Sequence, residues 1–295
     1  MNRIGIDVGG TKIEGVVLTD GGAERGRLRV ATPQGDYEAT VDRISGLVDQ
    51  LEAAHGRTPG PIGIGTPGAI DPSTGLLKNS NSVALNGRPF DVDLEKALGR
   101  PVILRNDADC FALSEARDGA AAGAAVVFGV IIGTGVGGGV VVGGQALSGP
   151  NAITGEWGHN PLPWPRDDER PGPECYCGLA GCIETFLSGP GFAARSGAPA
   201  ATDVIDAARQ GDSAALAQLD LYCDRLARSL ATIINVLDPD DIVLGGGMSN
   251  VDEIYQRVPD LWARYAFTST VATRLLKNRH GDSSGVRGAA WLVAN

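Results

Sequence analysis

The feature that most constrains the fold is a repeated pattern of strand, glycine-threonine turn and strand. The first copy occupies Ile6–Thr11 and continues through an apolar run to Gly21-Gly22. The second copy occupies Ile132–Gly138 and continues to Gly143-Gly144. The spacing between the copies is the same at the threonines and at the later glycine pairs, to within one residue. This pattern predicts a duplicated core whose halves each begin with two strands joined by a tight turn.

The two turns carry groups that can hold a polyphosphate. Glycines at strand ends expose backbone N–H groups with no Cβ in the way, and Thr11 and Thr134 each add a hydroxyl. Either turn alone is typical of an ordinary glycine hairpin, but their shared register favours a pair of phosphate turns. Other nucleotide signatures fail, because the Gly63–Gly68 and Gly133–Gly138 patterns precede no predicted helix and the chain has no Gly-Lys pair. A Rossmann oxidoreductase and a P-loop enzyme are thereby excluded.

Composition narrows the class of protein further. The length of 295 residues and a 43% hydrophobic content suit two domains with real cores. A net charge of −10 without a Lys/Arg cluster would repel a nucleic-acid backbone. The uncharged stretch from Gly119 to Gly155 is long enough for a membrane helix, but repeated glycines predict two buried strands instead. Asp7 breaks any secretory h-region, so we expect a cytoplasmic protein with reduced thiols and no membrane partner.

Hydrophobic periodicity predicts alternating strands and helices, which is typical of an α/β architecture. Apolar runs predict strands at Arg3–Asp7, Ile13–Thr19, Pro61–Gly65, Val102–Arg105, Val126–Ile132, Gly138–Val142 and Ile242–Leu244. Helical spacing predicts helices at Tyr37–His55, from Ala108, across most of Ile183–Val236, from Asp252 and after Ser284.

Three close cysteines and one upstream histidine suggest a metal site. Cys175, Cys177 and Cys182 lie on a glycine-containing loop, and His159 precedes it. Three thiolates and an imidazole make a tetrahedral Cys₃His zinc site, although the spacing is not the usual Cys-x₂-Cys. A disulfide is the alternative, but a reducing cytosol opposes it and one cysteine would be left over. Four protein ligands leave no open position, so we expect structural zinc.

Polar residues near the predicted strand ends are candidates for a ligand site. Asn106-Asp107 follows a strand and precedes a helix, so a helix cap is one interpretation and a ligand-facing carboxylate the other. Glu156, His159 and Glu184 flank the cysteine loop. Each of these acids alone is typical of a solvated surface. A ring of carboxylates, imidazole and amides is also what polyol recognition needs, because every sugar hydroxyl both donates and accepts.

Taken together, these segments resemble the ROK family of sugar kinases. The matching segments, in order, are Asp7–Lys12, Gly65–Gly68, Asn106–Ala108, Gly133–Gly135, Glu156–His159, Cys175–Glu184 and Gly245–Gly247. The match runs almost end to end. It implies an α/β fold of the two-lobed, actin-like ATPase (ribonuclease H-like) sugar kinase type with a duplicated core. The segments most similar to bacterial fructokinases are Lys78–Ser82, Asn160–Trp164 and His280–Gly288.

The resemblance implies a role for each candidate residue. Asp107 resembles the general base that takes a proton from the sugar hydroxyl. The residues that resemble sugar ligands are Gly68, Asn81, Asn106, Asp107, Glu156, His159 and Glu184. The residues that resemble nucleotide and magnesium ligands are Asp7, Gly9, Gly10, Thr11, Lys12, Thr134, Gly135, Gly245, Gly246 and Gly247. The cofactors implied are ATP and Mg²⁺ beside the structural Zn²⁺, and His159 would present one ring nitrogen to zinc and the other to a sugar hydroxyl.

The resemblance also implies an organisation and a substrate. We expect a small lobe of residues 1–117 completed by the last helix, about 284–295, and a large lobe of residues 118–283 with the zinc loop. Nucleotide and sugar would bind between the lobes, and the partner would be a second copy in a homodimer. The chain begins at the kinase motif, so we do not expect a transcription factor.

The expected reaction is phosphorylation of D-fructose to fructose 6-phosphate. Glucose, mannose and N-acetylhexosamine are the alternatives within the family, and a sugar sensor without catalysis is a more distant one. An acetamido group would need extra room and an apolar wall, and the sequence does not locate either.

Overall fold

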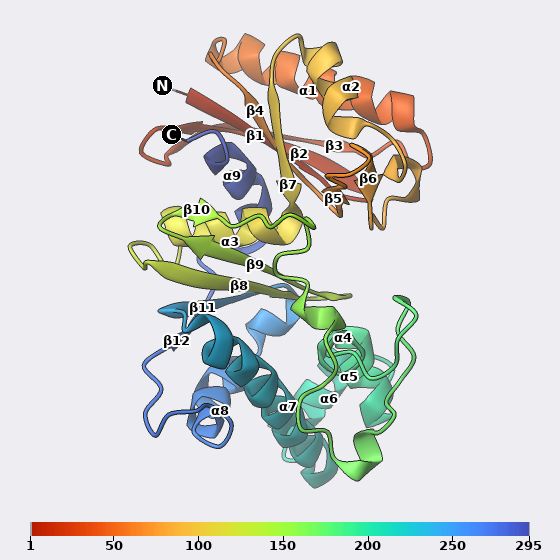
Figure 1. Cartoon of the computed structure of the whole chain (residues 1–295), viewed down its shortest axis with the longest axis vertical. Coiled ribbons are helices and arrows are strands. Elements are labelled where there is room, and N and C mark those ends of the chain that lie inside the picture. Colours follow the sequence, from red (N-terminus) through yellow and green to blue (C-terminus); the bar gives the residue numbers. More distant parts are fainter. Residues whose placement is uncertain (1, 295) are drawn as a thin grey trace. The chain divides into compact units, whose positions relative to one another are not determined.

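A computed structural model describes residues 2–294, and the chain forms two compact units (Figure 1). Unit 1 takes up residues 2–123, 139–154 and 279–294. Unit 2 takes up residues 124–138 and 155–278. The division of the chain into lobes at residue 117 stays a prediction.

Unit 1 is built around a five-stranded sheet with helices packed on it (Figure 1). Its strands are β1 (Asn2–Val8), β2 (Lys12–Thr19), β3 (Glu24–Ala31), β4 (Ile62–Thr66), β5 (Ala69–Ile70), β6 (Leu77–Lys78), β7 (Val102–Asn106) and β10 (Gln145–Ala146). Its helices are α1 (Tyr37–His55), α2 (Phe90–Leu98), α3 (Asp107–Arg117) and α9 (Ser284–Trp291), with short 3₁₀ turns η1 (Val83–Leu85) and η5 (Gly281–Ser283). The sheet has the order β3-β2-β1-β4-β7, and β4 runs parallel to both β1 and β7.

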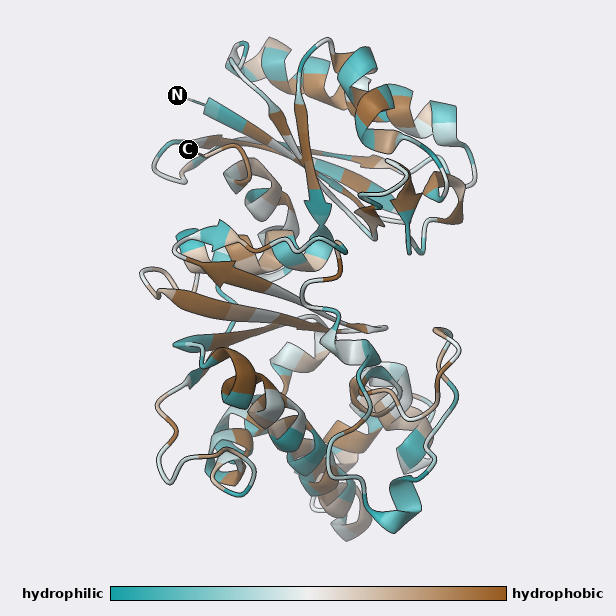
Figure 2. Cartoon of the chain, in the orientation of Figure 1, coloured by the Kyte–Doolittle hydropathy of each residue, from teal (hydrophilic) through white to brown (hydrophobic). Residues whose placement is uncertain are grey.

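Helix α1 is fixed by an N-terminal cap and by an apolar face that packs on the sheet. The Asp36 side chain accepts a hydrogen bond from the N–H of Ala39 at 3.0 Å and so caps the first turn. Apolar residues recur along one face, and Ile44, Leu47 and Leu51 are fully buried against the sheet. Burial of each such side chain stabilises the fold by about 1.5–3 kcal/mol. Figure 2 shows brown, apolar stretches along the strands and both apolar and polar bands along the helices.

The last helix, α9, packs on the sheet through glycines. A Cβ on Gly5 would collide with backbone atoms of Val286 and Ala290, and one on Gly63 would collide with the carbonyl of Ala289. Glycines in strand interiors therefore allow close backbone approach here.

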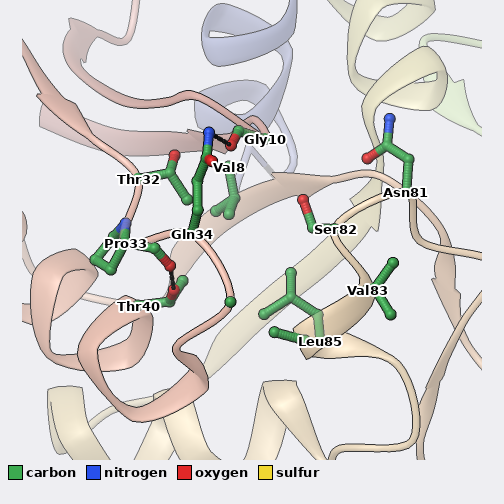
Figure 3. Close-up of a pocket in the computed structure, with 12 residues that line it drawn as sticks. Val8, Gly10, Thr32, Pro33, Gln34, Thr40, Asn81, Ser82, Val83 and Leu85 are labelled. Atoms are coloured by element: carbon green, nitrogen blue, oxygen red, sulfur yellow. Dashed lines mark hydrogen bonds between the residues drawn. The ribbon is translucent and has the colours of Figure 1, made fainter.

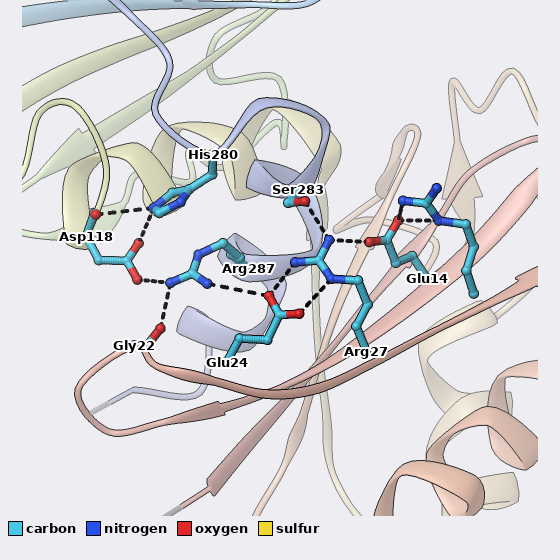
Figure 4. A network of polar contacts seen from close by, with 9 residues as sticks. Glu14, Gly22, Glu24, Arg27, Asp118, His280, Ser283 and Arg287 are labelled. Atoms are coloured by element: carbon cyan, nitrogen blue, oxygen red, sulfur yellow. Dashed lines mark hydrogen bonds and ion pairs between the residues drawn. The ribbon is translucent and has the colours of Figure 1, made fainter.

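A polar network also fixes α9 to unit 1 (Figure 4). Arg287 pairs with Asp118 and donates to the carbonyl of Gly22 at 2.7 Å. Deeper in the unit, the fully buried Glu115 carboxylate accepts from the Ala120 N–H, the Arg279 N–H and the Ser284 hydroxyl at 2.8, 3.0 and 2.8 Å. One carboxylate thus joins the end of α3 to the start of α9.

Unit 2 consists of a sheet and a set of helices. Its elements are β8 (Val126–Ile132), the start of β9 (Val136–Val142), α4 (Glu184–Leu187), α5 (Gly189–Ser196), α6 (Ala201–Arg209), α7 (Ser213–Leu237), β11 (Asp241–Gly245), α8 (Asp252–Trp262) and β12 (Arg274–Lys277). Short 3₁₀ turns η2 (Trp157–His159), η3 (Asp167–Glu169) and η4 (Gly247–Asn250) lie in its connections.

The second sheet repeats the order of the first. Its order is β10-β9-β8-β11-β12, so the first strand of each half lies in the middle, as in β3-β2-β1-β4-β7. In both sheets the middle strand is parallel to the next one along, as β1 is to β4 and β8 is to β11. The predicted α/β fold with a duplicated core is confirmed.

The sequence-based prediction missed the two-residue strands β5, β6 and β10 and three longer elements, β3, β12 and α2. Strands β3 and β12 lie at sheet edges, and β3 carries Glu24, Arg25, Arg27 and Arg29 where an apolar run would be expected. Charged side chains are how natural proteins protect an edge strand, so the apolar signal is weakest there. Helix α2 is short and buries only Phe90 and Leu94.

No helix within residues 2–294 combines the length and the apolar character needed to cross a membrane.

Candidate active site

The first glycine turn of unit 1 has its carbonyl groups occupied. The Gly9 carbonyl accepts from the Thr32 hydroxyl at 2.7 Å, and the Thr11 carbonyl accepts from the Thr32 N–H at 3.1 Å. The Gly9 N–H donates to the Lys12 carbonyl at 2.9 Å, which closes the turn between β1 and β2. Gly10 and Thr11 are exposed. Because the carbonyls are engaged elsewhere, the turn can present backbone donors to an anion.

Asp7 lies at the carboxyl end of β1 beside a second acid, Asp107. Burial and, to a smaller extent, the charges of Asp107 and Glu14 together raise the pKa of Asp7 to about 7, and the charge of Lys12 opposes them. Two carboxylates that repel each other are suited to share a divalent cation with oxygen ligands, so the donor set fits Mg²⁺.

Two glycines that the sequence analysis did not single out for this purpose make room for Asp7. A Cβ on Gly65 would lie 3.4 Å from the Asp7 carboxylate, and one on Gly285 would lie 3.3 Å from it. A Cβ at Gly65 would just touch this acid, and a Cβ at Gly285 would require it to shift slightly. A glycine inside a predicted strand indicates that another group approaches closely, and this pattern could have pointed to Gly65.

Asn106 and Asp107 stand where β7 ends and α3 begins. The Asn106 Oδ1 and the Asp107 Oδ1 both accept from the Ala108 N–H at 2.8 Å, so Asn106 does cap the helix. The Asn106 Nδ2 also donates to the Gly68 carbonyl at 3.3 Å. The cap interpretation and the ligand interpretation are therefore compatible, because the cap fixes both side chains at the end of a parallel strand.

Gly68 connects this pair to the segment that carries Asn81. Gly68 has a φ of +81°, and a Cβ there would lie 2.9 Å from the Ser80 N atom. Asn86 holds the same segment, since its Oδ1 accepts from the Ser80 N–H at 2.9 Å. Unit 1 thus brings Gly68, Asn106 and Asp107 together and sets the segment of Asn81 beside them.

The second glycine turn belongs to unit 2 and is held by Glu184. The Glu184 Oε2 accepts from the Val136 N–H at 2.8 Å, and a Cβ on Gly135 would lie 2.7 Å from the same oxygen. The Gly133 carbonyl accepts from the Gly189 N–H at 2.8 Å. Glu184, which the sequence predicts as a sugar ligand, thus holds the backbone of the second glycine turn, and its sugar-binding role stays a prediction.

Gly245–Gly247 lie next to this second turn. Strand β11 runs parallel to β8, and Gly245 pairs with Ile131. Gly246 has a φ of +77° and contacts the backbone of Ile132 so closely that a Cβ would collide with it. The glycine run and the turn that starts after Ile132 therefore share one end of the unit 2 sheet.

The cysteine loop forms a metal-binding geometry. The ligand atoms of His159, Cys175, Cys177 and Cys182 lie within 4.8 Å of one another, and the three thiols are free. The Cys177 and Cys182 Sγ atoms are 3.6 Å apart, and the Cys175 Sγ is 3.6 Å from the His159 Nδ1. Zinc–sulfur bonds of about 2.3 Å put the corners of a tetrahedron about 3.8 Å apart, so the residues present fit zinc.

The second ring nitrogen of His159 faces the side chain of Tyr176. Its Nε2 lies 3.0 Å from the Tyr176 hydroxyl, and the two rings meet edge to face. Partial burial and the charges of Glu184 and Glu156 raise the pKa of Tyr176 to about 12. The sequence analysis missed Tyr176, because its position between two cysteines does not indicate where its side chain points.

The three predicted sugar ligands of unit 2 lie close to one another. Burial raises the pKa of Glu156, His159 lowers it and Glu184 raises it. The charges of His159 and Glu184 therefore both act on the Glu156 carboxyl, and all three residues border the cysteine loop. This arrangement offers both acceptors and a donor to a polyol.

Comparison with known proteins identifies the family. Residues 3–295 match the ROK family. The N-acetyl-D-glucosamine kinase of Vibrio cholerae is 41% identical over 297 residues, with 98% of each chain covered. The N-acetyl-D-glucosamine kinase of Escherichia coli O157:H7 is 40% identical over 298 residues, again with 98% of each chain covered. The chain belongs to the ROK family, as its motifs indicated.

Solved structures agree with this assignment. The ROK hexokinase of Thermus thermophilus is 32% identical, with a TM-score of 0.88 over 99% of this chain and 97% of that one. The ROK glucokinase of Streptomyces griseus, in complex with glucose and AMPPNP, is 26% identical, with a TM-score of 0.78 over 99% of both chains. The protein is an ATP-dependent sugar kinase of the actin-like ATPase fold, and the fold implies Mg²⁺ with the nucleotide.

Proposed function

We propose that the protein transfers the γ-phosphoryl group of ATP to N-acetyl-D-glucosamine, at its 6-hydroxyl. The observation that carries the proposal is the identity of 38–41% to N-acetylglucosamine kinases along 98% of the chain. Our sequence-based preference for fructose rested on short segments around Asn81 and Asn160. Full-length identity outweighs those segments, so fructose becomes the second candidate.

In unit 1 the residues of the chain would carry out the transfer. Asp107 would accept the proton of the sugar hydroxyl as its oxygen bonds to the γ-phosphorus and the bond to ADP breaks. Asn106 would hold the sugar beside it, with Gly68 and Asn81. Gly9, Gly10, Thr11 and Lys12 would bind the phosphates. Asp7 would hold Mg²⁺, which supplies charge neutralisation on the phosphates when bound.

In unit 2 a second set of residues would complete the binding functions. Thr134 and Gly135 would bind phosphate, and Gly245, Gly246 and Gly247 would lie beside the adenosine. Glu156, His159 and Glu184 would bind sugar hydroxyls. His159 would hold zinc with Cys175, Cys177 and Cys182, and the metal would fix the ring and the loop without taking part in the chemistry.

One kinetic comparison tests the substrate. The value of kcat/KM would be measured for N-acetylglucosamine, fructose, glucose and mannose under identical MgATP. We expect N-acetylglucosamine to be preferred, because a site built for one pattern of hydrogen bonds can reject others by about 10⁴-fold. A preference for fructose would overturn the substrate and leave the kinase activity in place. The absence of ATP consumption with every sugar would favour a sugar sensor.

Two further features stay predictions. Light scattering of the purified protein tests the homodimer, and fractionation of the producing cells tests the cytoplasmic location.

A further inference from the structure

A cavity of about 240 Å³ lies in unit 1, and most of the residues that line it have no role in the mechanism above (Figure 3). One side is formed by the loop between β3 and α1, with Thr32 and Gln34. The facing side is formed by Ser82, Val83 and Leu85, at and after the segment that carries Asn81.

The position of the cavity connects it to the proposed substrate site. Asn81 and Gly10 both line it, and they belong to the proposed sugar ligands and to the first phosphate turn. A Cβ on Gly10 would lie 3.8 Å from the Ser82 Oγ. The wall of the cavity is therefore continuous with the segment that Gly68 holds beside Asn106. A substituent on a sugar bound there has a short path into the cavity.

The chemistry of the lining suits an amide with an apolar tail. Val8, Pro33, Ala84 and Leu85 supply an apolar wall. The Ser82 Oγ is buried and has no hydrogen-bond partner among the described residues. A hydroxyl can donate to an amide carbonyl or accept from an amide N–H, and a buried polar atom gains from such a partner. The extra room and the apolar wall that the sequence did not locate are both present.

The size of the cavity exceeds what an acetyl group needs. At about 30 Å³ for each water molecule, 240 Å³ corresponds to roughly eight waters, whereas an acetamido group has four non-hydrogen atoms. The cavity has no Lys or Arg in its lining, which disfavours a phosphate or carboxylate occupant.

We propose that this cavity receives the N-acyl group of an amino sugar and that it admits acyl chains longer than acetyl. The proposal rests on the proposed function and extends it from N-acetylglucosamine to N-acylated hexosamines as a class. Ser82 would bind the amide, and Ala84 and Leu85 would contact the acyl chain. All three are specificity-determining positions outside the phosphoryl-transfer machinery.

The first test is an acyl series with the wild-type protein. The kcat/KM values for N-acetyl-, N-propanoyl- and N-butanoylglucosamine would be measured under identical MgATP. We expect the longer acyl groups to stay within about fivefold of acetyl or to exceed it, since each buried methylene is worth about fourfold. A loss of more than a hundredfold on adding one methylene would overturn the proposal.

The second test fills the cavity and uses a matched control. Ala84→Phe should lower the ratio of kcat/KM for N-butanoylglucosamine to that for glucose by at least about tenfold. Val92→Phe, at an exposed site on α2 outside the cavity, should leave that ratio unchanged. Ser82→Ala should lower the ratio of N-acetylglucosamine to glucose by about tenfold, the size of one lost hydrogen bond.

The outcomes separate the two proposals. If N-acetylglucosamine is phosphorylated but Ala84→Phe changes no ratio, the cavity proposal fails and the proposed function stands. If fructose is the preferred substrate and no N-acylated sugar reacts, both fail.

Discussion

The two glycine turns of the duplicated core differ in where their acidic partner comes from. The turn of unit 1 follows β1, and β1 itself supplies Asp7, whose pKa burial raises to about 7. The turn of unit 2 follows β8, where Val130 occupies the position that matches Asp7 and is fully buried. Its acid is Glu184 at the start of α4, which accepts from the backbone of the turn instead.

The two halves of the duplicated core therefore differ in their functional side chains. The backbone of strand, turn and strand is repeated, but the carboxylates are not. The first copy carries acids suited to a cation and a proton, Asp7 and Asp107. The acid of the second copy belongs to the cysteine loop, because Glu184 follows Cys182 by two residues. We expect chemistry to fail when the first copy is altered, and binding to fail when the second is.

The largest effect is expected from Asp107→Asn in the first copy. The change keeps the volume and removes the basicity, so kcat should fall by about 10²–10⁴-fold while sugar affinity stays within a few-fold. Steady-state kinetics and sugar titration by calorimetry measure the two quantities. Asp71→Asn, in a loop of the same unit, is the matched control and should keep kcat. Turnover within a few-fold of wild type would make Asp107 a helix cap only.

The second largest effect is expected at the zinc loop of the second copy. Purified protein should contain about one zinc per chain, and Cys177→Ala should lose metal and activity together because Glu184 and His159 lose their support. Elemental analysis and kinetics would be run on the same samples. Cys223→Ala, a buried cysteine in α7, should keep its zinc. Fully active protein without zinc would remove the structural role of the metal.

The repeated scaffold could be predicted from the sequence because its signals are local. Apolar runs such as Val126–Ile132 and glycine turns at their ends are local patterns, and both appear where they were expected. The cluster of one histidine and three cysteines was also predictable, since the three cysteines lie within one short loop. The structure brings the same four side chains together.

The remaining features depend on contacts that no local pattern specifies. The bond from Val136 to Glu184 joins residues far apart in the chain, and the orientation of Tyr176 toward His159 depends on the loop as a whole. The cavity beside Ser82 forms between two loops that are distant in sequence. Edge strand β3 carries arginines that pair with the buried Glu14, and these charged residues replace the apolar pattern by which a strand is predicted.

A smaller and more selective effect is expected from two substitutions of Glu184. Glu184→Gln keeps an oxygen that can accept from the Val136 N–H, so KM for ATP should stay within about threefold while KM for the sugar rises. Glu184→Ala removes both roles and should raise both KM values, with a loss of about 10²-fold in kcat/KM. Glu174→Ala, at an exposed position of the same loop, is the control. Equal KM values for ATP in the Gln and Ala variants would contradict a turn-holding role.

The smallest effect concerns stability and reports on Asp7 in the first copy. The folded-state pKa of Asp7 is raised from 3.8 to about 7, so the folded protein binds this proton more tightly than the unfolded chain. Stability from this group is therefore fully present below pH 4 and is lost as the pH rises to about 7. Asp7→Asn cannot ionise and should melt a few degrees above wild type at pH 8, with little difference at pH 4.

The same measurement on a second aspartate sharpens this prediction. Hydrogen bonds from Ser73 lower the pKa of Asp71 to about 2, so the ionised form of Asp71 stabilises the folded protein at pH 8. Asp71→Asn should therefore not raise the melting temperature at pH 8. MgATP should raise the melting temperature of wild type more than that of Asp7→Asn, because a bound cation would stabilise the ionised carboxylate that only wild type has. Melting curves of both variants at pH 4 and pH 8, with and without MgATP, measure these differences. If Asp7→Asn melts below wild type at pH 8 without MgATP, Asp7 is stabilised as an anion by the fold itself, and the first copy then holds its acid as the second copy holds Glu184.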